Sequence, residues 1–322
     1  MAKAIARYPG MPILGVLPAM AKDPLKLIRQ MTLRYNDMVS AQMFNRQYVF
    51  VNDPNLVHKI LVTNTNDFRK SDRSINLISR AFGKGLLGNQ ANDTHKTQRK
   101  LIQPAFHKQK IRGYADMMTD YSRTFVAQWQ DGEIMDVSRA MNSLTMYIVA
   151  KALFGANMSD VEGDAYEAAQ AIDVLQQETI RLTTSLWLWP KWMPTPSNRR
   201  LAKARSVIDR TLAKLIAQRR ERGDLAEADG PNDFLAMLLV AEYDDGSKME
   251  DGQIKDELAT MFFAGHETTA NSLTWTFYLL AQNPEARARL HQELDTVLQG
   301  RPATLDDLPS RPYTEMVVKE SL

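Results

Sequence analysis

The 322-residue sequence contains no cysteine. A chain without thiols can form no disulfide, and it can provide no iron–sulfur cluster, thiolate-held zinc site or cysteine nucleophile. Neither sign of charge is in excess, because 40 Lys and Arg residues stand against 38 Asp and Glu residues, a net charge of +2. Nucleic-acid-binding proteins usually carry a basic excess on one face. The composition therefore gives no support for a nucleic-acid partner.

Long hydrophobic runs are missing as well. A membrane-spanning helix needs about 20 predominantly apolar residues, and stretches such as 275–281 are far shorter and lie inside a mixed helical pattern. Prolines at 9, 12 and 18 interrupt the N-terminal segment, whereas a signal peptide needs an unbroken apolar stretch. We therefore expect a cytoplasmic globular protein without a transmembrane segment.

Hydrophobic periodicity and turn residues predict a mainly α fold with a small N-terminal β region. The short β-prone runs 39–44 and 47–51 predict a hairpin. Asp53-Pro54 predicts the start of a helix. We predict one domain over 1–322, with a β-containing region 1–65, a helical region 66–322 and a surface loop at 223–231. The expected later helices are 95–106, 110–130, 136–154, 163–186, 197–222, 232–243, 251–282, 284–299 and 313–322.

The helix predicted over 251–282 is about 45 Å long, which is enough to cross a domain. Its centre reads Ala264-Gly-His-Glu-Thr-Thr269, and a glycine, an acid and two threonines are poorly suited to a buried helix centre. Thr268 can hydrogen-bond back to the Ala264 carbonyl, and the small residues 264 and 265 would let a flat ligand approach. Local conflicts of this kind indicate a functional site.

The string allows two other interpretations. In the first, Glu267 faces solvent and the threonines only pack. In the second, His266 and Glu267 begin a zinc-peptidase motif, but that motif needs a second histidine at position 270, which is alanine. The second interpretation is excluded.

The segment Ala264–Thr269 resembles the oxygen-activating signature of the cytochrome P450 haem-thiolate monooxygenases. Segments 8–15 and 95–107 resemble the proline-rich entry and the third helix of that family, and Glu320 resembles its Glu-x-x-Arg glutamate. The resemblance implies a cytochrome P450 fold of the soluble bacterial type and haem b as cofactor. It implies a monooxygenase that inserts one atom of O2 into a hydrophobic substrate, with a ferredoxin- or flavodoxin-type electron donor.

The resemblance also implies roles for individual residues. Glu267 and Thr268 are expected to relay protons as catalytic residues, while Ala264, Gly265 and Thr268 contact the haem and Glu320 is structural. His95 and Arg99 lie four residues apart on one helix face and are expected to hold the haem propionates. The alternative for this pair is a solvated basic stripe that includes the neighbouring lysines.

An apolar region before residue 88 suits a lipid-like or terpenoid substrate, with ordinary core contacts as the alternative. The candidate substrate residues are Phe82, Leu86, Leu87, Met261 and Thr269. Three tryptophans surround Pro190 and could touch a membrane surface, although packing beneath a loop is the expectation; they are Trp187, Trp189 and Trp192.

The family holds its haem iron with a cysteine thiolate, and this chain contains none. No histidine occupies an equivalent place, so no metal ligand is predicted here. We expect the N-terminal portion of a monooxygenase, which as a 322-residue chain binds haem weakly and is inactive. The alternative is a non-catalytic helical binding protein that keeps the distal half of the fold. We further expect Gly265 and Thr268 to line the largest apolar cavity beside a disturbed backbone hydrogen bond, with His95 and Arg99 pointing towards it.

Overall fold

The computed structural model describes residues 5–35, 37–90, 93–155, 164–183, 185, 188–223 and 233–322. Most of the loop predicted over 223–231 lies outside these residues, as does Trp187. The chain divides into two compact units, Met1–Ser71 and Asp72–Leu322. Each unit is described by itself.

The first unit contains a three-stranded sheet in the order β1 (Ala6–Arg7), β2 (Met38–Met43) and β3 (Arg46–Val51). Strands β2 and β3 pair antiparallel, which confirms the predicted hairpin, and β1 pairs parallel with β2. The short helices are α1 (Leu17–Lys22), α2 (Pro24–Arg34) and α3 (Pro54–His58). At the start of α3, Asp53 Oδ1 accepts from the Leu56 amide at 2.9 Å. The core of this unit comprises Val16, Leu27, Met31, Val39 and Ala41.

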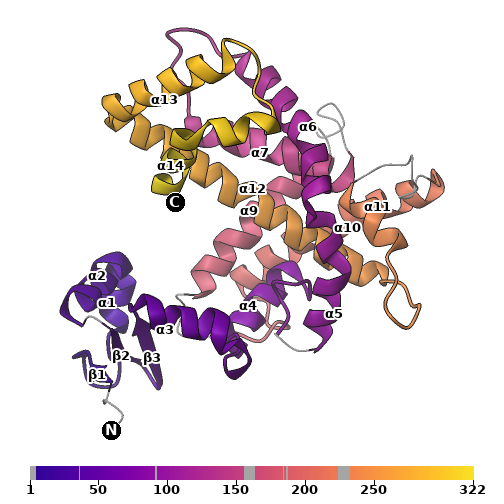
Figure 1. Cartoon of the computed structure of the whole chain (residues 1–322). Coiled ribbons are helices and arrows are strands. Elements are labelled where there is room, and N and C mark those ends of the chain that lie inside the picture. Colours follow the sequence, from indigo (N-terminus) through magenta and orange to yellow (C-terminus); the bar gives the residue numbers. More distant parts are fainter. Residues whose placement is uncertain are drawn as a thin grey trace. The chain divides into compact units, whose positions relative to one another are not determined.

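The second unit is built around α12 (Asp251–Gln282), which runs through the middle of the other helices of this unit (Figure 1). Helix α12 packs along α7 (Val137–Phe154) and also contacts α10 (Pro196–Glu221). Leu258 and Ala259 of α12 are completely buried in this core. The remaining helices are α4 (Asp72–Phe82), α5 (Asp93–Ile102), α6 (Lys108–Val126), α9 (Asp164–Thr183), α11 (Phe234–Val240), α13 (Pro284–Leu298) and α14 (Pro312–Ser321).

The mainly helical fold class is confirmed, but several predicted helices were too long, among them 95–106, 110–130 and 232–243. Residues 103–106 form a 3-10 helix after α5, because Pro104 has no N–H to continue the α-helical ladder. Helix α11 ends at Val240, and the chain then turns back through a bridge between Glu242 and Lys248. Among the described helices, none has the length and apolar character that crossing a bilayer requires.

A buried ion pair joins the ends of three helices. Arg219 Nη2 of α10 lies 2.8 Å from Asp233 Oδ2, and each side chain is less than a tenth exposed. The pair is a charge contact rather than a hydrogen bond, since Oδ2 has no hydrogen-bond partner among the described residues. Arg219 also donates to the Phe154 carbonyl at 2.9 Å, and Asp233 Oδ1 accepts from the Ala236 amide at 2.9 Å. The pair therefore ties α10 to the end of α7 and the start of α11.

Replacing Arg219 by methionine should lower the free energy of unfolding by about 3 kcal/mol, because Asp233 is left as an uncompensated buried charge. The matched control is Arg220→Met, since Arg220 pairs with Asp251 where both side chains are about half exposed. That change should cost less than about 1 kcal/mol. Urea denaturation of both variants measures the difference. Equal losses would contradict the role of the Arg219 pair.

Candidate functional site

The centre of α12 has two opposite faces. Phe262, His266 and Ala270 are buried, at the four-residue spacing that places side chains on one side of a helix. Ala264 and Thr268 lie on the other side and are exposed. The exposed stripe continues at the same helical spacing through Asn271, Trp275 and Tyr278. The string 264–269 is therefore divided between a packed face and an open face.

Thr268 Oγ1 donates a hydrogen bond to the Ala264 carbonyl at 2.6 Å. This bond confirms the predicted return of the threonine hydroxyl to the preceding turn. Helix α12 is nevertheless continuous from Asp251 to Gln282, so the backbone disturbance expected beside Gly265 and Thr268 does not interrupt the helix. The oxygen keeps its lone pairs available on the open face.

Gly265 is explained by helix packing. A Cβ atom added at this position would lie 3.0 Å from Val149 Cγ2 of α7, which is closer than ordinary van der Waals contact. The glycine therefore lets α7 and α12 approach one another. Its predicted contact with a cofactor stays a prediction.

His266 is a buried titratable residue to which sequence reasoning gave no role. Its side chain lies against α7, with Nε2 at 3.1 Å from the Asn142 carbonyl oxygen. A carbonyl only accepts, so Nε2 carries the proton and donates. Burial lowers the pKa of His266, although Asp173, the bond to Asn142 and Glu267 oppose that shift. His266 is thus neutral at pH 7 and belongs to the packed face.

The residues predicted to hold propionates lie on α5. His95 is half-buried and Arg99 is exposed. The adjacent Lys100 pairs with Asp244 at 2.8 Å, and the buried Gln98 accepts from Asn89 at 2.9 Å. The role of His95 and Arg99 stays a prediction.

The predicted substrate residues differ in burial. Phe82 is 1% exposed and its ring stacks on Phe263, with centroids 4.3 Å apart. Leu86 and Met261 are partly buried against the same core, whereas Thr269 is exposed. Leu87 is half-buried. Phe82 therefore makes the ordinary core contact that was the alternative to a substrate contact. It also lies beside Phe263, the residue that precedes Ala264.

The tryptophan-containing loop before α10 was expected to pack its tryptophans underneath. That expectation is wrong for Trp192, which is 79% exposed, and for Trp189, which is 48% exposed. The loop backbone is held instead by polar contacts. Arg80 donates to the Trp189 carbonyl and Asn198 to the Pro190 carbonyl, each at 2.8 Å.

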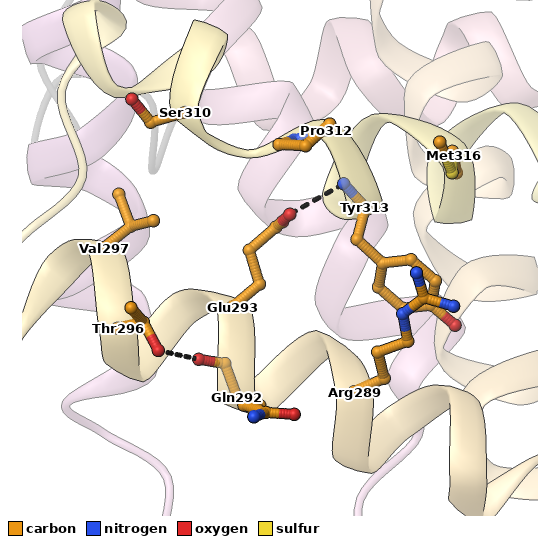
Figure 2. A pocket seen from close by; sticks show the side chains of 9 residues that line it. All are labelled: Arg289, Gln292, Glu293, Thr296, Val297, Ser310, Pro312, Tyr313 and Met316. Carbon is orange, nitrogen blue, oxygen red and sulfur yellow. Dashed lines mark hydrogen bonds between the residues drawn. The ribbon is translucent and has the colours of Figure 1, made fainter.

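Three cavities of about 420, 470 and 460 Å³ lie elsewhere on the second unit. The first lies between α13 and α14, where Glu293 accepts a hydrogen bond from the Tyr313 amide at 2.7 Å (Figure 2). Glu293 also accepts from the Thr314 amide at 2.8 Å. The second includes Glu320 of α14 and the end of α12. Gly265 and Thr268 line none of these three cavities, and their expected place in an apolar cavity stays a prediction.

Glu257 is the site residue that sequence reasoning missed. Its side chain is completely buried in the first half of α12, and it accepts hydrogen bonds from the Leu86 amide at 3.0 Å and from Gln253 Nε2 at 2.7 Å. Burial raises the pKa of Glu257 to about 7, against the opposing effect of these two hydrogen bonds and with a smaller contribution from Asp256. The sequence could have indicated this burial, because Glu257 lies between the apolar positions Ile254 and Leu258 of the same helix.

The stability of the protein should depend on the protonation of Glu257. A folded pKa of about 7 against an ordinary 4.5 means that the folded state favours the protonated acid. This contribution is complete below about pH 4.5 and is lost as the pH rises to about 7, a change of about 3 kcal/mol. Urea denaturation at about pH 5 and about pH 8 should show this loss in the wild type and not in Glu257→Gln. The exposed control Glu250→Gln should lose stability between these pH values as the wild type does. If Glu257→Gln loses as much stability as this control, the raised pKa of Glu257 is contradicted.

Comparison with known proteins assigns the chain to a family. The family model of cytochrome P450 matches residues 7–322. The chain therefore belongs to the cytochrome P450 family.

The chain is 32% identical to cyclooctat-9-en-7-ol 5-monooxygenase of Streptomyces melanosporofaciens, over 97% of this chain and 66% of that protein. It is 31% identical to pentalenene oxygenase of Streptomyces avermitilis, over 97% of this chain and 67% of that protein. The crystal structure of the cytochrome P450DA heme domain shares the fold, with a TM-score of 0.84 and 23% identity over 99% of this chain and 69% of that one. The chain thus spans about two thirds of the length of these curated relatives.

Proposed function

We propose that the open face of α12 binds haem b and that the protein acts as a haem-dependent monooxygenase, inserting one atom of O2 into a hydrophobic substrate. The observation that carries the proposal is the pairing of Ala264 and Thr268 on an exposed face in the middle of a helix whose other face is buried. A methyl group and a hydroxyl stand where a packed helix would present larger apolar side chains.

The open face suits a flat apolar macrocycle. Ala264 projects only a methyl group, so a ring can approach the helix closely there. Trp275 and Tyr278 extend the stripe and are 58% and 53% exposed; contiguous exposed apolar surface commonly marks a binding site. His95 and Arg99 would supply donors for the two haem carboxylates, with the guanidinium giving a forked contact.

Bound haem supplies the redox chemistry with O2. Thr268 Oγ1 donates its own proton to the Ala264 carbonyl, so its lone pairs accept a hydrogen bond from water on the open face. Glu267 is half-buried beside it, and its carboxylate exchanges protons with that water. A positioned acid in a poorly solvated site is suited to controlled proton transfer.

The proposed substrate is an apolar terpenoid, as predicted from the region containing Leu86 and Leu87. Two similar proteins are named for cyclooctat-9-en-7-ol and pentalenene, which supports this class. The proposed electron donor is of the ferredoxin or flavodoxin type, and the proposed location is the cytoplasm. Because the sequence contains no cysteine, a thiolate ligand to iron cannot come from these 322 residues. We therefore expect weak haem binding and no turnover from this chain alone.

Replacing Ala264 by phenylalanine should weaken haem binding about tenfold, or about 1.4 kcal/mol, because the ring would occupy the space above the helix. Titration of haemin followed by Soret absorbance measures the affinity. The matched control is Ala288→Phe at an exposed alanine of α13, which should bind like the wild type. Equal weakening by both changes, or by neither, would contradict haem binding at the open face.

A further inference from the structure

A glycine-rich loop, residues 83–89, follows α4 and is tied through its backbone to the first half of α12. The Lys84 amide donates to Asp256 Oδ2 at 2.7 Å, and the Leu86 amide donates to Glu257 Oε2 at 3.0 Å. Gln253 Nε2 donates both to the Lys84 carbonyl at 3.2 Å and to Glu257 Oε1 at 2.7 Å. Three backbone groups of the loop, the amide and carbonyl of Lys84 and the amide of Leu86, are thus held by one helix.

The loop approaches α12 more closely than side chains would allow. A Cβ atom on Gly85 would lie 2.4 Å from Thr260 Oγ1 and 2.6 Å from the Asp256 carbonyl oxygen. Gly83 has a φ of +78°, a conformation that other residues rarely adopt, and a Cβ there would meet the Asp256 carboxylate. The glycines at 83 and 85 are therefore required for this contact.

The buried carboxyl of Glu257 is costly in isolation. Glutamate is seldom completely buried, and burying a polar group stabilises a fold only when its hydrogen bonds are made. Leu258 and Ala259, the next residues in the helix, are also fully buried, so an apolar side chain would suit this environment. What Glu257 adds is an acceptor for the Leu86 amide.

Arg205 of α10 supports the same arrangement from the other side. Its guanidinium pairs with the carboxylates of Asp209 and Asp256, and it donates to the Ala81 carbonyl at 3.5 Å. Ala81 lies in the last turn of α4, just before the loop. The Asp256 carboxylate, which accepts a hydrogen bond from the Lys84 amide, is thus itself held in place by Arg205.

The loop and the end of α4 bring apolar residues against the main core and the middle of α12. Leu86 packs against the main core, and Phe82, at the end of α4, stacks on Phe263. Phe263 directly precedes Ala264. Leu86, Phe82 and Phe263 are called the apolar wall below, and the position of Leu86 in this wall depends on how the loop lies on α12.

We propose that Glu257 is a positioning residue: by accepting the Leu86 amide it holds the 83–89 loop on α12 and so fixes the apolar wall that contacts the substrate. The consequence for substrate rests on the proposed function. Glutamine can accept the same hydrogen bond, whereas alanine cannot. To hold the loop, position 257 therefore needs a side-chain oxygen that accepts from the Leu86 amide, and it does not need a negative charge.

The first test measures hydrogen exchange of the Lys84 and Leu86 amides in the ligand-free chain. Glu257→Ala should speed exchange at Leu86 by about tenfold or more, because a hydrogen-bonded amide becomes free to open. Glu257→Gln should keep the wild-type protection, and so should Glu250→Ala, which removes an exposed glutamate near the start of the same helix. If Glu257→Ala fails to fold, Gln253→Ala should show a smaller loss of protection at both amides.

The second test measures the affinity for pentalenene by equilibrium dialysis. Glu257→Ala should weaken binding about tenfold while Glu257→Gln binds like the wild type. Leu235→Ala is the control for general destabilisation, because Leu235 is completely buried in α11 and does not touch the loop contacts described above. That variant should lose stability and keep its affinity.

The outcomes separate the two proposals. Wild-type protection of Leu86 in Glu257→Ala would overturn the positioning role, and so would loss of that protection with unchanged pentalenene affinity. Lost protection together with weakened affinity, both restored in Glu257→Gln, would support it. If the wild type binds no pentalenene, the proposed substrate class fails, and the exchange measurement alone decides the role of Glu257.

Discussion

The contact between α7 and α12 is the constraint on which the site depends. Gly265 admits Val149, His266 donates to the Asn142 carbonyl, and Ala270 is completely buried. These contacts fix the rotation of α12 about its own axis. Because successive helix residues point about 100° apart, fixing one face also fixes where Ala264 and Thr268 point. The open face is a consequence of the packed one.

The same helix organises a second feature about two to three turns earlier. There the acids Asp256 and Glu257 lie among buried apolar side chains such as Ile254 and Leu258, and they hold the 83–89 loop by accepting hydrogen bonds from its main-chain amides. A carboxyl in a dry environment is destabilising, and burial raises the pKa of Glu257 because it disfavours the charged form. That cost is understandable if the loop needs one defined position, because apolar contacts alone are not directional. The packing of α12 thus relates the catalytic residues proposed at its centre to the substrate residues proposed in the loop.

Local sequence rules predicted the features that depend on neighbouring residues. The bounds of α12 match the predicted 251–282 because a proline at 284 ends the pattern, and the Thr268 bond to Ala264 follows from their spacing. Which residues of the string face α7 could not be predicted, since a six-residue segment does not indicate on which side its neighbours lie. Glu257 was missed for the same reason: its partner, the Leu86 amide, is 171 residues away. Strand β1 has only two residues and no periodicity to detect.

The claim that the Ala264–Thr268 face binds the cofactor can be tested at a single atom. The sequence contains no cysteine, so Thr268→Cys introduces one thiol whose reaction with a maleimide reports access to this face. Metal-free protoporphyrin IX occupies the site without offering iron to that thiol, and Thr296→Cys, at an exposed threonine of α13, is the matched control. The account predicts that the porphyrin slows labelling at position 268 and leaves labelling at position 296 unchanged. Labelling at 268 that proceeds at the same rate with and without saturating porphyrin would contradict it.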